Sequence, residues 1–198
     1  MSIQFTRPEQ FANISSLGLA IVENDLKKME TLLLSGICDP NDNTTLYTRA
    51  CSPPYCGWDG FPFTSGLSSL HIAVLKANID ALEKLLAFDD IMVDSVDENG
   101  ETPLFYVSYA FADLFGRKGD LVQGNLLPKF RMMNLLIDAG TNIDAVNNDG
   151  ETALMKAAVK RQVEVVKFFI EKGADLTVMS KTGVPFRYFL DLPFRFWR

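Results

Sequence analysis

The sequence predicts an all-α fold, a solenoid of helix-turn-helix units joined by short β-turn fingers. Four times along the 198 residues, a polar start is followed by a small apolar helix, a second apolar helix and a Gly or polar stop. Hydrophobic residues make up 47% of the chain, which is enough for a packed core. Turn sequences such as Asp97-Glu-Asn-Gly100 and Asn147-Asn-Asp-Gly150 separate consecutive units.

Each unit begins with a hydroxyl side chain that can cap a helix. This position holds Ser15, Ser68, Thr102 and Thr152. A Ser or Thr oxygen at the N-cap accepts a backbone N–H of the first turn. Pro103 follows Thr102, where its fixed φ suits the first helical turn. The first helix of each unit is therefore predicted to start here.

The second helix of each unit has apolar residues at i, i+3 and i+4 spacing, as in Val166, Phe169 and Ile170. A glycine, which tolerates positive φ, stands where three of these helices should end. These glycines are Gly36, Gly140 and Gly173. The pattern predicts a core of Leu17, Ala20, Leu32, Leu33, Leu70, Ala73, Leu85, Leu86, Leu104, Leu136, Leu154, Ala157 and Phe169.

These units resemble the ankyrin repeat, a turn and two helices of about 33 residues with the pattern T-P-L-H-x-A. Ser68-Ser-Leu-His-Ile-Ala73 and Thr102-Pro-Leu-Phe-Tyr-Val107 are imperfect copies of that pattern. The resemblance implies a single ankyrin-repeat domain over 1–198. It consists of four repeats, about 13–41, 67–95, 102–145 and 149–178, and a degenerate cap over 180–198.

Two insertions interrupt the repeat spacing. The repeats start at 15, 68, 102 and 152, and only the interval from 68 to 102 is near the family period. The first insertion, about 42–66, is rich in Pro, Gly and aromatics and is predicted to be a surface loop. The second, about 110–128, is predicted to lengthen a first helix and then form a loop, with Pro128 starting the next helix.

Charge and segment composition limit the class of partner and the compartment. A net charge of -6 argues against nucleic acid and anionic membranes as main partners, since both are polyanions. Residues 1–11 contain no apolar core of a signal peptide, and no stretch reaches the ~18 apolar residues of a membrane span. We expect a cytoplasmic monomer, with delivery into a host cell without an N-terminal signal as the alternative.

The residues offer little catalytic or metal chemistry, and the chain is predicted not to be an enzyme. His71 is the only histidine, and the resemblance implies a structural role for it. No Gly-rich phosphate loop is present, and no cofactor is expected. Cys51 and Cys56, with Cys38 and His71, make a candidate zinc set. Ordinary loop and core cysteines are the favoured alternative, because the other ligands are scattered.

The resemblance implies a protein-interaction module that binds its partner on the concave face made by finger tips and first helices. The aromatic first insertion is a second candidate contact, because Trp and Tyr are enriched at binding hot spots. Acidic finger residues would suit a partner with a basic surface. The expected partner-binding residues are Tyr55, Trp58, Phe61, Phe63, Lys76, Glu98, Asn99, Glu101, Tyr106, Tyr109, Asn148, Asp149, Glu151, Lys156 and Lys160.

An adaptor or inhibitor is the leading functional hypothesis. The alternatives are a bacterial effector that binds a host protein and an immunity protein that neutralises a toxin. An enzyme with its site in the insertions comes last. The aromatic tail Phe194-Arg-Phe-Trp-Arg198 is expected to pack on the last repeat rather than to form an exposed docking segment.

Overall fold

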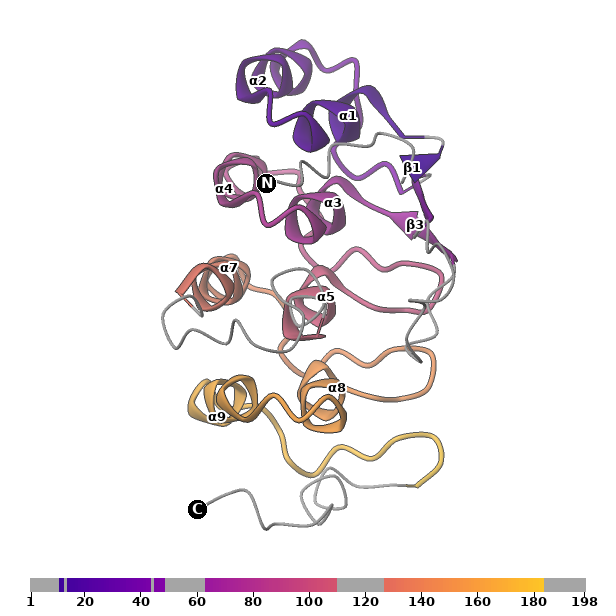
Figure 1. Ribbon diagram of the computed structural model, residues 1–198, viewed down its shortest axis with the longest axis vertical. Coiled ribbons are helices and arrows are strands. Elements are labelled where there is room, and N and C mark those ends of the chain that lie inside the picture. Colours follow the sequence, from indigo (N-terminus) through magenta and orange to yellow (C-terminus); the bar gives the residue numbers. More distant parts are fainter. Residues whose placement is uncertain (1–10, 13, 44, 49–62, 110–126, 184–198) are drawn as a thin grey trace, which may run out of the picture. The chain divides into compact units, whose positions relative to one another are not determined.

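The computed structural model describes residues 11–12, 14–43, 45–48, 63–109 and 127–183. The chain divides into two compact parts, an N-terminal part, Met1–Glu98, and a C-terminal part, Asn99–Arg198. Each part is built from helix pairs (Figure 1). The prediction of one domain over 1–198 stays a prediction.

The N-terminal part contains two helix pairs. Helices α1, Ser16–Val22, and α2, Leu26–Ser35, form the first pair, and α3, Ser69–Leu75, and α4, Ile79–Leu86, form the second. Equivalent helices pack on each other, α1 on α3 and α2 on α4. The predicted cap at Ser15 is confirmed, since its Oγ accepts the Gly18 N–H at 3.0 Å.

The C-terminal part repeats this plan with α5, Pro103–Tyr109, α7, Leu127–Asp138, α8, Ala153–Val159, and α9, Val163–Glu171. Helix α5 packs against α7 and α8, and α8 packs against α9. Thr152 caps α8 by accepting the Met155 N–H at 3.2 Å. Pro103 is the first residue of α5 and Pro128 lies in the first turn of α7, as predicted.

A three-stranded antiparallel sheet lies in the N-terminal part. Its strands are β1, Phe11–Ala12, β2, Thr45–Thr48, and β3, Phe63–Leu67, in the order β1-β2-β3. The prediction that 42–66 is only a loop is wrong for β2 and for the part of β3 within this range. The short run Thr45-Leu-Tyr-Thr48 consists largely of β-branched and aromatic residues, which favour strands. Antiparallel pairing with β3 then satisfies its backbone groups.

The core matches the prediction at most positions. All the predicted core residues are buried except Leu32 and Leu86, which are half-buried. Gly36, Gly140 and Gly173 have φ of +63°, +89° and +85°, so the predicted helix ends are confirmed. The predicted core list left out several side chains that are at most 1% exposed, namely Ile21, Met29, Phe105, Met132, Met133, Val165 and Val166.

Three predictions fall outside the described residues. They are the proposed lengthening of α5 beyond Tyr109, the loop of the second insertion, and the packing of the tail Phe194–Arg198. Within the part of the chain that the structure describes, no helix is both long enough and apolar enough to cross a membrane.

Candidate functional site

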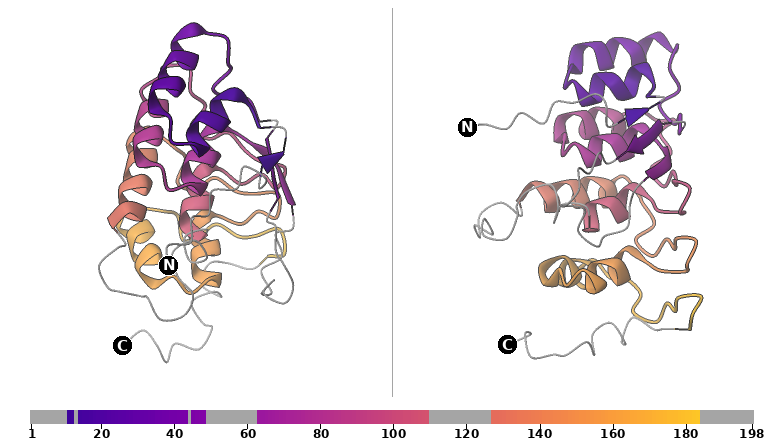
Figure 2. Two further views of the ribbon diagram at one scale, coloured as in Figure 1. Left: turned by 45° about the horizontal axis from the view of Figure 1, so that its top comes forward. Right: turned by 45° about the vertical axis from the view of Figure 1, so that its right-hand side comes forward.

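The candidate binding residues lie on turn fingers, which we define as residues 96–101, 146–151 and 179–183. In the C-terminal part, the fingers 146–151 and 179–183 project from the same side of the helices (Figures 1 and 2). Finger 146–151 is closed by an isolated antiparallel bridge between Val146 and Thr152. Finger 179–183 is closed by a hydrogen bond of 2.8 Å from Gly183 N to Ser180 O.

Backbone hydrogen bonds tie neighbouring fingers together. In the C-terminal part, Asn148 N donates to Asn99 O at 2.8 Å, and Lys181 N donates to Asp149 O at 2.9 Å. In the N-terminal part, Glu98 N donates to Ser65 O of β3 at 3.1 Å. Each finger is therefore held by main-chain bonds, which do not depend on the identity of the side chains it presents.

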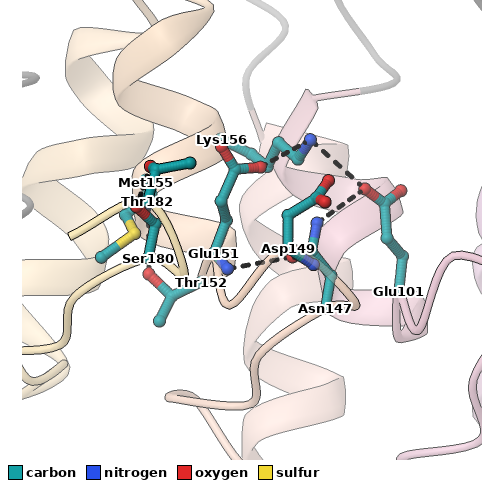
Figure 3. A network of polar contacts seen from close by, with 9 residues as sticks. All are labelled: Glu101, Asn147, Asp149, Glu151, Thr152, Met155, Lys156, Ser180 and Thr182. Carbon is teal, nitrogen blue, oxygen red and sulfur yellow. Dashed lines mark hydrogen bonds and ion pairs between the residues drawn. The ribbon is translucent and has the colours of Figure 1, made fainter. Parts of the chain in front are cut away.

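Asn147 organises its own finger from within (Figure 3). Its Oδ1 accepts the N–H groups of Asp149 at 3.0 Å and Glu151 at 2.9 Å. Its backbone N donates to Glu151 O at 2.9 Å. The side chain of Asn147 is buried, so these bonds replace the water that an open turn would bind.

Lys156 of α8 contacts two carboxylates, that of Glu151 in finger 146–151 and that of Glu101, which lies two residues before α5. Its Nζ lies 2.8 Å from Glu151 Oε2 and 3.6 Å from Glu101 Oε1 (Figure 3). Asn147 Nδ2 donates to the same Glu101 oxygen at 3.4 Å. Burial on its own would lower the pKa of Lys156, but the hydrogen bond to Glu151 and the charges of Glu101, Glu151 and Asp149 hold this pKa above its ordinary value.

Two of the expected partner-binding residues have buried side chains. Glu101 is 2% exposed and Tyr106 is 4% exposed, so the expectation that they contact a partner is wrong. Every residue from Glu101 to Ser108 is buried, because α5 packs against both α7 and α8. The Glu101 carboxylate is used inside the chain, by Lys156 and Asn147.

The other expected contact residues in the described range reach solvent. Glu98, Asn148 and Asp149 are exposed. Glu98 also accepts hydrogen bonds from the Ser65 hydroxyl and the Ser65 N–H, which lower the pKa of its carboxyl group. The half-buried residues are Lys76, whose pKa burial lowers, and Asn99, Glu151, Lys156 and Lys160.

The aromatic candidates belong mostly to the undescribed range. Tyr55, Trp58 and Phe61 lie outside the described residues. The backbone places Phe63 at the start of β3 and Tyr109 at the end of α5. Their part in binding therefore stays a prediction.

His71 has the structural role that the resemblance implies. It is fully buried, and Ser68 N donates to its Nδ1 at 3.2 Å. The Ser68 hydroxyl lies 2.8 Å from the same nitrogen and 2.7 Å from Ser95 Oγ. This network joins the start of α3 to the segment before finger 96–101.

Only part of the candidate zinc set lies within the described residues. Cys51 and Cys56 lie outside the described residues, and Cys38 is a free cysteine. The Nδ1 of His71 is engaged with Ser68. Among the residues that the structure describes, no three His, Cys, Asp or Glu side chains gather as a metal site.

Sequence reasoning missed an exposed apolar position on the fingers. Val96, Val146 and Met179 are 47%, 50% and 62% exposed. Each lies four residues before the finger glycine, which is Gly100, Gly150 or Gly183. Aligning the fingers on these glycines would have revealed the recurring apolar residue.

Comparisons with known proteins identify the repeat. A family model described as ankyrin repeats (3 copies) matches residues 126–180. A palmitoyltransferase of Lachancea kluyveri is 32% identical over 121 residues, covering 60% of this chain and 14% of that protein. The human B-cell lymphoma 3 protein is 29% identical over 102 residues, covering 52% of this chain and 20% of its own length.

A probable serine/threonine-protein kinase of Dictyostelium discoideum is 34% identical over 164 residues, covering 64% of this chain and 15% of the kinase. The chain thus spans a fifth or less of the length of these three relatives. Ankyrin repeats imply a helix-turn-helix solenoid and indicate a protein–protein interaction module, and the described residues are mainly helical. Residues 126–180 are therefore ankyrin repeats.

Proposed function

We propose that this chain acts as an adaptor or inhibitor that binds a partner protein through its turn fingers and the adjoining first helices. The observation that carries the proposal is the combination of exposed tips with a fixed backbone. Asn148 and Asp149 are exposed, while their finger is bonded to both neighbours through Asn99 and Lys181. A surface that is already ordered loses little conformational entropy when a partner binds.

The charges at the tips support a partner with a basic surface. Glu98 and Asp149 are exposed carboxylates, and Glu151 is half-buried next to Lys156. Exposed charges act mainly by steering the encounter, and salt screens this effect. The partner's basic groups should therefore speed association more than they slow dissociation.

The aromatic segment of the first insertion is part of the proposal. Strand β3 is hydrogen-bonded to the neighbouring finger through Ser65 O and Glu98 N. The insertion therefore rejoins the repeat on the finger side, which supports a role for Tyr55, Trp58, Phe61 and Phe63 beside the finger surface. Buried aromatic side chains are typical hot spots of protein interfaces.

The test begins with affinity capture of the partner from a native lysate and its identification by mass spectrometry. A host protein would support a delivered effector, and a toxin would support an immunity protein. Surface-plasmon kinetics on the captured partner then compare Trp58→Ala, Asp149→Lys and a chain shortened within 110–126. Glu171→Lys, an exposed charge reversal on α9, is the matched control.

We expect Trp58→Ala to raise the off-rate, with a loss of about 2 kcal/mol or more if it is a hot spot. Asp149→Lys should slow association, and the defect should shrink as salt rises. The control and the shortened chain should bind normally. Loss of binding in the shortened chain with no effect of Trp58→Ala would mean that the partner uses another surface. The charge-reversal variants do not include Glu101, because its side chain is buried and reversing a buried charge would disturb folding.

A further inference from the structure

We propose that the Asn99–Gly100 pair of finger 96–101 is a site of spontaneous covalent modification, at which the Asn99 amide is converted to a carboxylate by the adjacent backbone and water. Asn99 is the only asparagine in the chain that is followed by glycine. Because glycine has no Cβ, its backbone N can approach a neighbouring group more closely than that of other residues. The modification does not depend on the proposed function, whereas its effect on binding does.

The backbone N of Gly100 is available as the nucleophile. Gly100 is half-buried, and its N–H donates to no backbone carbonyl within the described residues. At the equivalent place in finger 146–151, Gly150 is buried and its N donates to Asn147 O at 2.9 Å. A nitrogen that is engaged in this way must lose a hydrogen bond before it can attack. The structure therefore distinguishes Gly100 from the glycine of the next finger.

The carbonyl of the same peptide group is held by a donor. Asn99 O accepts the Asn148 N–H at 2.8 Å. When a peptide N–H loses its proton, much of the negative charge resides on the carbonyl oxygen, and a hydrogen bond to that oxygen stabilises the anion. The bond that ties finger 96–101 to finger 146–151 thus favours formation of the nucleophile at Gly100.

The reaction consumes one water and releases one ammonia. Solvent takes the proton of the Gly100 N–H, and the nitrogen forms a bond with Asn99 Cγ. The bond from Cγ to Nδ2 then breaks, and Nδ2 takes a proton from water and leaves as ammonia. Water next adds to one of the two carbonyl carbons of the resulting five-membered imide, and the bond from that carbon to the Gly100 nitrogen breaks. Opening at Cγ gives aspartate, and opening at the main-chain carbon gives isoaspartate.

Isoaspartate should disrupt the contact between the two fingers. Its backbone runs through the former side chain and is one methylene longer. A Cβ added to Gly100 would lie 2.9 Å from Asn148 N, so the neighbouring finger leaves little room for a longer backbone. The carbonyl that accepts the Asn148 N–H would also become a carboxylate outside the main chain. Both products add a negative charge to the finger, which under the proposed function alters the encounter with a basic partner.

The test follows the purified full chain over time at neutral pH, both folded and unfolded in urea. Peptide mass spectrometry measures the conversion of Asn99, and enzymatic methylation of isoaspartate identifies that product. Asp149→Asn is the matched control, because it gives finger 146–151 the same type of pair at an exposed residue. Asp149 O likewise accepts a backbone N–H, from Lys181 at 2.9 Å, so the two sites differ in the hydrogen bond of Gly150 N.

We expect Asn99 to be converted in the folded chain at least as fast as in urea, with isoaspartate among the products. In the folded Asp149→Asn variant, position 149 should react about tenfold more slowly than Asn99, because Gly150 N must first give up its hydrogen bond. Conversion of Asn99 that is slower in the folded chain than in urea would overturn the proposal. Equal rates at the two positions of the folded variant would also overturn it.

Hydrogen exchange tests the consequence for the fingers. The Asn148 amide should exchange faster in the converted chain than in an equally aged Asn99→Gln chain, whose longer side chain closes a ring much more slowly. Unchanged protection of Asn148 would show that the bond between the fingers survives the modification, contrary to the proposal. None of these measurements uses a partner, so their failure would leave the proposed function intact.

Discussion

Gly150 lies directly against the backbone of Lys181 on the next finger. A Cβ atom added to Gly150 would be 2.8 Å from Lys181 N, the atom that donates to Asp149 O. Gly150 also has φ of +72°, a conformation that residues with a Cβ adopt at a cost. The glycine therefore permits both the turn and the close approach of the neighbouring finger.

Gly150→Ala should lower the free energy of unfolding by about 2–3 kcal/mol, the sum of a left-handed backbone and a backbone clash. Gly173→Ala is the control, because Gly173 has φ of +85° with nothing within 4 Å of the added Cβ. The control should cost about 1–2 kcal/mol. Urea denaturation of both variants measures the difference. Equal losses would show that the finger contact adds nothing to stability.

Lys156→Met should destabilise the C-terminal part by about 2–3 kcal/mol, because it removes a cationic partner of the buried Glu101 carboxylate. The matched change is Lys167→Met, which breaks an exposed pair with Glu164 on α9. That change should cost at most about 0.5 kcal/mol. Thermal or urea unfolding compares the two variants. A loss no larger than that of the control would mean that water replaces the ammonium group at Glu101.

Lys129 should make stability rise with pH. Its side chain is buried, its Nζ donates to Ser108 O and Gln162 Oε1, and burial lowers its pKa to about 8. The unfolded chain keeps this proton up to pH ~10.4. Between pH 8 and 10 the unfolded state thus binds more protons, and the penalty from Lys129 disappears as pH rises through this window.

The gain between pH 8 and 10 should be about 2 kcal/mol, because the full effect of the shift, about 3 kcal/mol, is reached only above the pKa of the unfolded chain. Urea midpoints from pH 7 to 10 measure it, and Lys129→Met is the reference that subtracts the titration of other groups. If the variant and the parent chain show the same slope, Lys129 is not the group responsible.

Removing the hydroxyl group of Ser68 or of Thr102, which hold equivalent positions before α3 and α5, should change the free energy of unfolding in different directions. Ser68 bonds with His71 and Ser95, so Ser68→Ala should cost about 1–2 kcal/mol. Within the described residues, the buried Thr102 Oγ1 has no hydrogen-bond partner, and Phe105 stands where the equivalent repeat has His71. Thr102→Val should leave stability unchanged or raise it by up to about 1 kcal/mol. A clear loss on Thr102→Val would reveal a partner such as water.

Leu154→Ala should cost about 2–5 kcal/mol, the usual range for truncating a buried leucine. Leu154 is fully buried in α8, which contacts both α5 and α9. Leu176→Ala, at 42% exposure, is the control and should have a much smaller effect. A denaturation midpoint that does not move for Leu154→Ala would contradict its place in the core.

Local features of the fold could be predicted because neighbouring residues decide them. A hydroxyl at Ser15 or Thr152 caps the helix that follows within three residues. Gly36 and Gly140 end helices because of their own backbone freedom. The 3.6-residue period likewise placed Leu136 and Phe169 in the core.

The candidate binding site depends on contacts between residues that are far apart in the sequence, which a local sequence pattern cannot predict. Glu101 looked like a rim carboxylate, but its side chain is buried and forms an ion pair with Lys156, a residue far away in the sequence. Strands β2 and β3 lie in a segment whose Pro and Gly suggested a loop, and their pairing across the insertion made them strands. The exposure of Val146 and Met179 also follows from the fingers, where buried Asn147 and Ser180 turn their apolar neighbours outward.

By itself, the sequence determined the repeating helix pairs, their caps and most of their core, because short-range hydrogen bonding and helical periodicity act within a few residues. Only the tertiary structure decided which charged residues remain available to a partner. That outcome depends on burial and on ion pairs between segments that meet only after the chain has folded.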